Sequence, residues 1–297
     1  MKTLLKLGVL SSVVLPLVAC DVLDSDNNKN QFYYSNPTNS AITMKIDDKN
    51  YTIESGTSGS VKLSPGIHTV QDSQGNKSSF MVFENNKGGI INPNNYMYYA
   101  LSEVYAAEGH ADRFKPVDYK VTINGYELEM PMKSSNATVI DGNVFQCSYS
   151  LGKPFPEEIK TFDKKSQGNI KSKCFDKTEL LNYFETDYGE KLTPPSKGDE
   201  NNDTVNMVFD YTIPVPQFKQ ADIQKEAEKL VALLNQIKES DDPDIHNKLN
   251  KEIHQTTMDL VSVHTKHTAM NTVAENEYYN QFIHQTGNLR GFGVLPK

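Results

Sequence analysis

Histidines are the residues of this sequence whose type and spacing first suggest chemistry. His264 and His267 are one helical turn apart and would share a face, as two zinc ligands do. No cysteine lies nearby, and the acids of the region do not fall at a spacing that completes a zinc site. His267 occupies an inner position of a heptad pattern, so we predict a core histidine, no metal and no cofactor. Five of the seven histidines lie in this region: His246, His254, His264, His267 and His284.

Catalytic and nucleotide-binding motifs are also missing from the sequence. The run SGTSGS (residues 55–60) is not a GxSxG nucleophile elbow and is typical of a turn. Neither GxxxxGK[ST] nor GxGxxG occurs, so a phosphate-binding loop is not indicated. We therefore predict a protein that is not an enzyme. A hydrolase acting on a cell-wall or lipid substrate is the enzymatic alternative, because two carboxylates that are far apart in the sequence can come together in the fold.

Two cysteines in the middle of the chain, Cys147 and Cys174, form an isolated pair. In an oxidising compartment such a pair is typical of a disulfide. Two buried free thiols are the alternative. No CxxC occurs, so a redox enzyme of the usual type is not indicated.

The first half of the sequence alternates apolar and polar residues, as strands do. Residues 42–53 have a hairpin pattern, and residues 119–130 have a clearer one with an Asn124-Gly125 turn. Residues 145–151 and 205–213 alternate as further strands. The stretch VKLSPGIHTV (61–70) resembles the L-x-P-G-x-H-x-V corner of PEGA-type envelope modules, a resemblance that implies a β-sandwich.

The last quarter of the chain is helical by pattern. Apolar residues repeat at spacings of four and three over 220–240 and, more loosely, over 244–285, which predicts an antiparallel helical hairpin. At 1.5 Å per residue the helices span about 30 and about 60 Å, so the second overhangs the first. The overhang needs the β part, a second copy or a partner protein to cover it. Its aromatic residues are candidate partner contacts: Tyr278, Tyr279 and Phe282.

The N-terminus has the pattern of an export signal. Lys2 and Lys6 precede an apolar stretch, residues 7–18, that is too short to span a bilayer. The following LVAC, ending at Cys20, resembles the lipobox of bacterial lipoproteins. The resemblance implies that Cys20 becomes the mature N-terminus and carries a diacylglycerol and usually a third acyl chain such as palmitate, a stable anchor. Asp21 resembles the signal that retains enteric lipoproteins on the inner membrane, which favours the inner over the outer membrane.

The charge balance of the chain limits the classes of partner that it can bind. The formal net charge of −8 becomes −10 when residues 1–19, with their two lysines, are removed. An acidic chain without a run of basic residues is a poor nucleic-acid binder, because phosphate contacts need clustered cations. Anionic lipid surfaces would repel it, so we expect the lipid to hold the protein at the membrane.

These patterns together predict an α+β protein with one or two N-terminal antiparallel β-sandwich regions followed by a C-terminal antiparallel helical hairpin. The predicted parts are a signal peptide (1–19), a flexible tether (20–31), a β-sandwich-like domain (32–110), a second β-rich or mixed domain (111–216), the helical hairpin (217–287) and a tail (288–297).

The functional expectation is a lipid-anchored, periplasm-facing binding protein of the cell envelope. Its most concrete form is an immunity-type lipoprotein that captures a protein toxin, because an acidic surface steers a basic partner. The alternative is a structural or assembly lipoprotein whose helical hairpin docks into an envelope complex.

Overall fold

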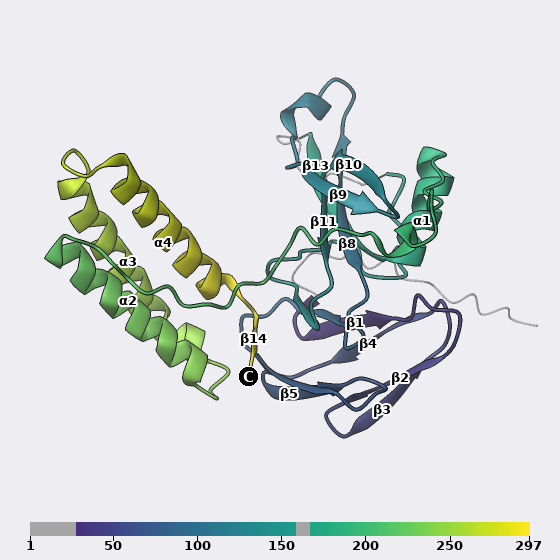
Figure 1. Cartoon of the computed structure of the whole chain (residues 1–297), viewed down its shortest axis with the longest axis horizontal. Helices are drawn as coiled ribbons and strands as arrows, with labels where there is room; N and C mark the ends of the chain where they lie inside the picture. Colours follow the sequence, from purple (N-terminus) through teal and green to yellow (C-terminus); the bar gives the residue numbers. More distant parts are fainter. Residues whose placement is uncertain (1–27, 159–166) are drawn as a thin grey trace, which may run out of the picture.

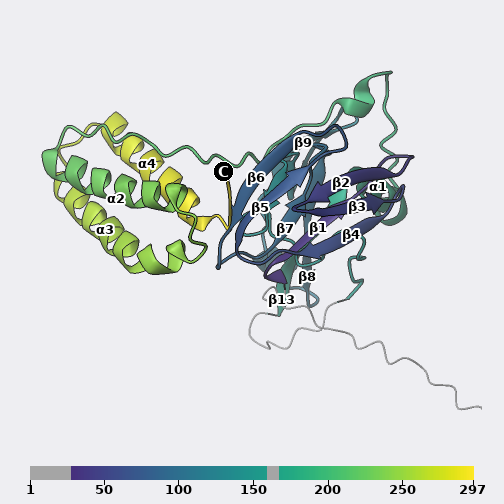
Figure 2. The ribbon, with the colours of Figure 1, turned by 90° about the horizontal axis from the view of Figure 1, so that it is seen from below.

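The computed structural model describes residues 28–158 and 167–297, and in these ranges the chain is an α+β protein. Figure 1 shows β-sheets at one end and the helices α2, α3 and α4 at the other, joined by extended crossings. The view from below separates the same two parts (Figure 2). The α+β class is thus as the sequence predicted.

Two sheets make up the N-terminal part of the β region. One has the strand order β12-β7-β1-β4 and the other β14-β6-β5-β2-β3; neighbours are antiparallel except β1 and β7. A single buried cluster takes side chains from both sheets, including Phe32, Ile46 and Phe80. The strands are β1 (Gln31–Ser35), β2 (Ile42–Ile46), β3 (Lys49–Ile53), β4 (Ser58–Lys62), β5 (Gly66–Gln71), β6 (Lys77–Val82), β7 (Gly89–Ile91), β12 (Val139–Asp141) and β14 (Val294–Pro296).

A third sheet, of order β11-β8-β13, stands on the first two. Helix α1 (Lys177–Tyr183) packs against it through the buried Leu180. Its strands are β8 (Tyr98–Ala106), β11 (Met132–Ser135) and β13 (Gly168–Asp176). The sheets combine strands from both sides of residue 110, and the C-terminal β14 pairs with β6 near the start of the chain.

The predicted hairpin at 119–130 is confirmed. Strands β9 (Tyr119–Ile123) and β10 (Tyr126–Met130) pair in register from Ile123 opposite Tyr126. Asn124 and Gly125 have φ values of 51° and 83°, the two positive angles that a type I′ turn requires.

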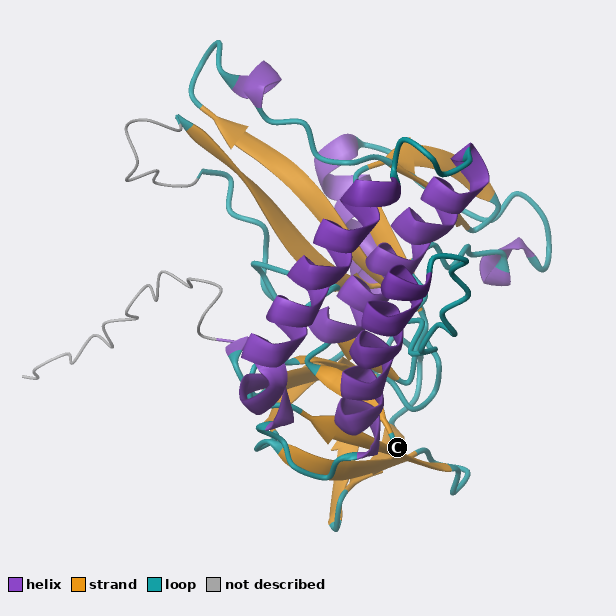
Figure 3. Ribbon diagram, turned by 90° about the vertical axis from the view of Figure 1, so that its left-hand side faces the viewer, coloured by secondary structure: helices purple, strands orange, loops and turns teal. Residues whose placement is uncertain are grey.

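The predicted two-helix hairpin is in fact a unit of three helices: α2 (Ala221–Glu239), α3 (Ile245–His267) and α4 (Val273–Gly291). The expected continuous helix over 244–285 breaks after His267 because Thr272 begins a new helix with a capping box. Its side chain accepts a bond from the Glu275 N–H, and the Glu275 carboxylate accepts one from the Thr272 N–H at 2.7 Å. Figure 3 shows α2, α3 and α4 side by side in front of the sheets.

The predicted hairpin at 42–53 is also present, as β2 paired with β3, but two other predicted strands differ from the structure. Residues 205–213 are extended but join no sheet in the described chain, and residues 145–151 form only an isolated bridge between Tyr149 and Lys173. Alternation places Phe145 and Phe209 in the core. Residues 148–149 bond β13 only around Ser172 and Cys174, and residues 206–207 bond the β11 backbone only at Ser134, so neither segment forms a continuous ladder.

Candidate functional site

One extended crossing, residues 204–218, leads from the β part to the helices, and we call it the strap (Figure 1). Its side chains alternate between the core and solvent. Phe209 is 9% exposed and packs with Phe292 and the helices, whereas Val208 and Val215 are 75% and 72% exposed. Exposed apolar side chains on a fixed, extended backbone are available to a partner.

The strap is fastened at both ends by side chains. At the β end the Asn206 amide accepts the Ser134 N–H at 2.7 Å, and Met207 N–H donates to the Ser134 carbonyl at 2.9 Å. At the helix end the Tyr278 hydroxyl donates to the Val215 carbonyl at 2.9 Å, and Gln285 donates to the Thr212 carbonyl at 3.0 Å. These bonds hold the strap in place without a sheet.

Between these fastenings the backbone of residues 208–211 has no hydrogen-bond partner among the residues that the structure describes. Buried backbone groups are almost always paired, so an unpaired stretch of this kind must face solvent or a ligand. An extended run of free N–H and C=O groups is a template for strand pairing.

A groove of about 890 Å³ lies between the strap and α4, and we call it the α4 groove. This volume is within the range of ligand-binding clefts, which occur preferentially where two parts of a molecule meet. On the β14 side of the strap a smaller cavity of about 280 Å³ is lined by Phe209, Tyr211 and β14. The α4 side chains that line the larger groove are Asn280, Gln281, His284, Gln285 and Asn288.

Charge is almost absent from both walls of the α4 groove. The strap and residues 278–289 of α4 contain a single charged residue, Asp210, in a chain of which 23% is charged. Hydrogen bonds from Thr212 lower the pKa of Asp210, so this carboxylate stays ionised at neutral pH. Depletion of charged side chains is a feature of the centre of protein interfaces.

A second crossing fixes the helices against the sheets. It consists of residues 291–297, which include β14, and we call it the C-terminal return. The buried Asp141 carboxylate accepts the N–H groups of Gly293 at 2.7 Å and Val294 at 3.0 Å, and that of Asn143 at 2.7 Å. Burial raises the pKa of Asp141 to about 7, although these donors lower it. A side chain at position 293 would collide with Asn143, whose Oδ1 lies 2.5 Å from an added Cβ, so glycine is required there.

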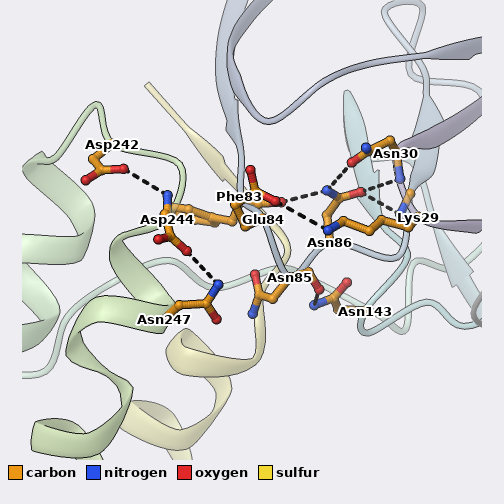
Figure 4. A network of polar contacts seen from close by, with 11 residues as sticks. Lys29, Asn30, Phe83, Glu84, Asn85, Asn86, Asn143, Asp242, Asp244 and Asn247 are labelled. Atoms are coloured by element: carbon orange, nitrogen blue, oxygen red, sulfur yellow. Dashed lines mark hydrogen bonds and ion pairs between the residues drawn. The ribbon is translucent and has the colours of Figure 1, made fainter.

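Asparagines contribute further hydrogen bonds at this junction between the sheets and the helices (Figure 4). Asn86 donates to the Phe83 carbonyl at 2.6 Å and accepts the Asn30 N–H at 2.8 Å. Glu84 N–H donates to the Pro243 carbonyl, in the α2–α3 turn, at 2.9 Å. The α2–α3 turn is therefore bonded to the chain just after β6, which holds the helices against the sheets.

His246 of α3 completes this junction. Its ring lies on Phe83 with centroids 4.0 Å apart, and its Nδ1 is 3.3 Å from the Asn85 amide. Burial, aided by the charge of Arg290, lowers the pKa of His246 to about 4, so the imidazole is neutral at pH 7. A neutral ring can pack on an aromatic side chain without the cost of burying a charge.

The predicted aromatic partner contacts are placed inside the chain. Tyr279 and Phe282 are 7% and 2% exposed, and both pack on Phe218 of the strap. They are not available to a partner, because they lie on the face of α4 that packs against the strap and α2. Tyr278 remains partly exposed, and its hydroxyl bonds the strap backbone.

The two histidines that were considered as metal ligands have different partners in the structure. His264 is buried, stacks on Tyr279 with centroids 3.4 Å apart and contacts Asn276, whereas His267 pairs with Asp222 at 3.0 Å. Within residues 28–158 and 167–297 no three His, Cys, Asp or Glu side chains gather as metal ligands do. His267 was predicted to be the core residue of the two, and it is His264 that is buried.

The cysteine prediction is confirmed where the structure describes it. Cys147 and Cys174 form a disulfide, with Cα atoms 5.5 Å apart, beside β13. Cys20 lies outside the described residues. In the described part of the chain, every helix is too short or too polar to cross a bilayer.

The α4 groove and Asp141 were missed by reasoning from the sequence. The strap was interpreted as an ordinary strand and α4 as part of a longer helix. The available signal was the scarcity of charge in both segments, which lie 59 residues apart and meet only in the fold. Asp141 carried no signal, because its partners Gly293 and Val294 are at the other end of the chain.

Comparisons of the chain with protein-family models, with curated proteins and with solved structures find no match.

Proposed function

We propose that this is a lipid-anchored, periplasm-facing binding protein that is not an enzyme and that holds a protein partner in the α4 groove. The observation that carries the proposal is the groove itself, which is wide and fixed at both walls, and Asp210 is the single charged residue among the described residues that line it. Its exposed Val208 offers apolar contact area at the centre. Neutral interface centres surrounded by charge are typical of protein recognition.

An immunity-type lipoprotein that captures a toxin is the most concrete form of this function. The chain as a whole is acidic, with a net charge of −8, or −10 without residues 1–19. Such a field raises the rate at which a basic partner arrives, while the groove supplies the short-range contacts.

The anchor and the architecture belong to the same proposal. Lipidation at Cys20 and the polar tether (20–31) would let the folded part stand off the membrane, preferentially the inner one. The two sheets that share the Phe32 cluster would form a β-sandwich that carries the groove. In membrane fractions of the native cells, Cys20→Ser should release the protein into the soluble fraction; retention would contradict the lipid anchor.

A structural or assembly role is the second candidate. Met270 and Val273, at the α3–α4 turn, are each 74% exposed and form an apolar tip at the far end of the helical unit. Docking of this tip into an envelope complex would leave the α4 groove empty. Met270→Ser with Val273→Ser should then dissolve the complex.

Site-specific crosslinking tests the groove directly. A photoreactive residue replaces Gln281 on the groove wall of α4 in the full chain, and a matched control carries it at the exposed Lys251 of α3. After irradiation of living cells we expect one partner protein to be joined at position 281 and none at position 251. Adding Val208→Arg should abolish that product.

The identity of the product separates the two roles. A secreted, toxin-like protein would support capture, and several envelope components would support assembly. No product at position 281, or equal products at both positions, would contradict the proposal.

A further inference from the structure

The side chain of Asp210 lies on the side of the strap that is turned towards α4. Its Oδ1 accepts the Thr212 N–H at 2.9 Å, and its Oδ2 lies 3.5 Å from Nε2 of Gln285, on α4. The same Gln285 amide donates to the Thr212 carbonyl at 3.0 Å. Because Asp210 and Gln285 both line the α4 groove, these contacts hold the carboxylate at the groove wall.

This carboxylate has no cationic partner in the part of the chain that the structure describes. None of the ion pairs there includes Asp210, and the described residues that line the α4 groove include neither lysine nor arginine. Hydrogen bonds from Thr212, and not a neighbouring cation, lower the pKa of Asp210. Other acids of the chain do form pairs, for example Asp203 with Lys177 at 2.6 Å. Asp210 therefore presents a negative charge that the described residues do not neutralise.

Binding of any partner in the α4 groove changes the surroundings of this charge. In the open groove water solvates the carboxylate, as it does other exposed acids. A partner that fills the groove removes this water, and a carboxylate that is covered without a cation costs free energy. A partner that brings a cation to Asp210 avoids this cost and gains a charge-assisted hydrogen bond. The groove therefore selects against partners that place a neutral or acidic group at this point.

The α4 wall of the groove supplies acceptors for the rest of such a cation. Gln281, Gln285 and Asn288 line it with neutral side-chain amides, each of which has an oxygen that accepts hydrogen bonds. A guanidinium has five N–H groups in one plane, more than one carboxylate can bond. An arginine that pairs with Asp210 can give its remaining N–H groups to these oxygens, and its methylene groups can lie on the exposed Val208.

We propose that Asp210 is the specificity-determining residue of the α4 groove and that it pairs with a single basic side chain of the protein partner, arginine in preference to lysine. The planar guanidinium can bond a carboxylate and neighbouring amides at once, whereas an ammonium acts as a point charge. The inference rests on the proposed binding function and names the chemistry of the partner. It agrees with the net charge of −8, which attracts a basic protein over a longer distance.

Peptide selection on the full chain tests the proposal. Short random peptides displayed on phage are selected on the native chain, on Asp210→Asn and on Glu252→Gln. The asparagine keeps the oxygen that accepts the Thr212 N–H, and Glu252 is an exposed acid of α3 outside the groove, so each variant loses one charge. We expect arginine, and less strongly lysine, to be enriched at one peptide position by about 10-fold on the native chain and on Glu252→Gln, and not on Asp210→Asn.

A selected peptide then separates the charge of the arginine from its shape. The arginine is replaced by citrulline, which has nearly the same shape and no charge. By isothermal titration calorimetry, this replacement should weaken binding to the native chain by about 10-fold and binding to Asp210→Asn by less than about 2-fold. Equal losses in both proteins would show that the arginine bonds another residue, and would overturn the proposal.

The remaining outcomes separate this inference from the proposed function. Enrichment of acidic residues, equal enrichment of basic residues on the native chain and on Asp210→Asn, or no enriched peptide would overturn the pairing with Asp210. If crosslinking at position 281 still yields a partner in those cases, the binding function stands and only the assigned chemistry of the partner is wrong. If crosslinking fails as well, both are wrong.

Discussion

The two crossings between the β part and the helices are both extended, and they are built in opposite ways. In the C-terminal return, Asp141 and strand β6 bond the backbone, and the side chains of Val294 and Leu295 are buried. In the strap, the backbone of residues 208–211 bonds no residue of the described ranges, and Val208 is exposed. One crossing thus fastens the molecule, while the other is bonded near its ends, and its middle is where we propose that a partner binds.

The strongest way to break the contrast is to remove an end fastening of the strap. Phe282→Ala deletes a buried ring that packs on Phe218 with centroids 5.4 Å apart. We expect the free energy of unfolding to fall by about 3–5 kcal/mol, because a cavity is left in the core. Urea unfolding measures it, with the exposed Gln281→Ala as the control, which should change stability by less than about 0.5 kcal/mol. Equal, small effects would mean that Phe282 is a free contact surface.

Titration of Asp141 sharpens the account of the fastened crossing. Its pKa is about 7 in the folded chain against 3.8 for the ordinary group. Between these values the folded chain binds more protons, so the unfolding free energy should fall as pH rises, by roughly 4 kcal/mol in all. Asp141→Asn should remove this fall when unfolding curves are compared from pH 4 to 7. A variant with the slope of the native chain would show that Asp141 is ionised throughout.

His246, at the same junction, should act in the opposite direction. Its folded pKa is about 4 against 6.5 for the ordinary group. The unfolded chain therefore binds more protons in this window, and stability is lost as pH falls, by roughly 3 kcal/mol. His246→Phe keeps a ring on Phe83 but does not titrate, so the loss below pH 6.5 should disappear. Unfolding curves of this variant across the same pH range test the prediction. An unchanged loss of unfolding free energy at acid pH would contradict a buried neutral imidazole.

The smallest effect on stability is expected in the open middle of the strap. Val208→Arg changes a side chain that is 75% exposed, so the unfolding free energy should shift by less than about 0.5 kcal/mol. Partner crosslinking from the groove should nevertheless be lost. A large loss of stability would mean that Val208 is part of the core.

Features that depend on a few residues close together could be predicted from the sequence. The Asn124-Gly125 hairpin and the Cys147–Cys174 disulfide appear as expected, because turn conformation and the pairing of two cysteines depend on few residues. The break before α4 was also readable in the Thr272-to-Glu275 capping box. The heptad pattern concealed it, because apolar residues continue at similar spacing on both sides of the break.

Features that depend on distant segments could not be predicted. Alternation in residues 205–213 correctly indicates an extended chain with Phe209 inside. Whether such a chain joins a sheet depends on which edges the rest of the fold leaves beside it. The α4 groove exists because the turn at residues 268–272, after which the Thr272 capping box begins α4, brings α4 back beside the strap.

Amide hydrogen exchange of the unliganded full chain tests the central contrast most directly. The account predicts that Val208, Phe209, Asp210 and Tyr211 exchange almost as fast as an unstructured peptide. Gly293 and Val294, held by Asp141, should exchange only when the helices separate from the sheets. Slow exchange throughout residues 208–211 would contradict the account, because it would mean that the strap backbone is already paired and has nothing to offer a partner.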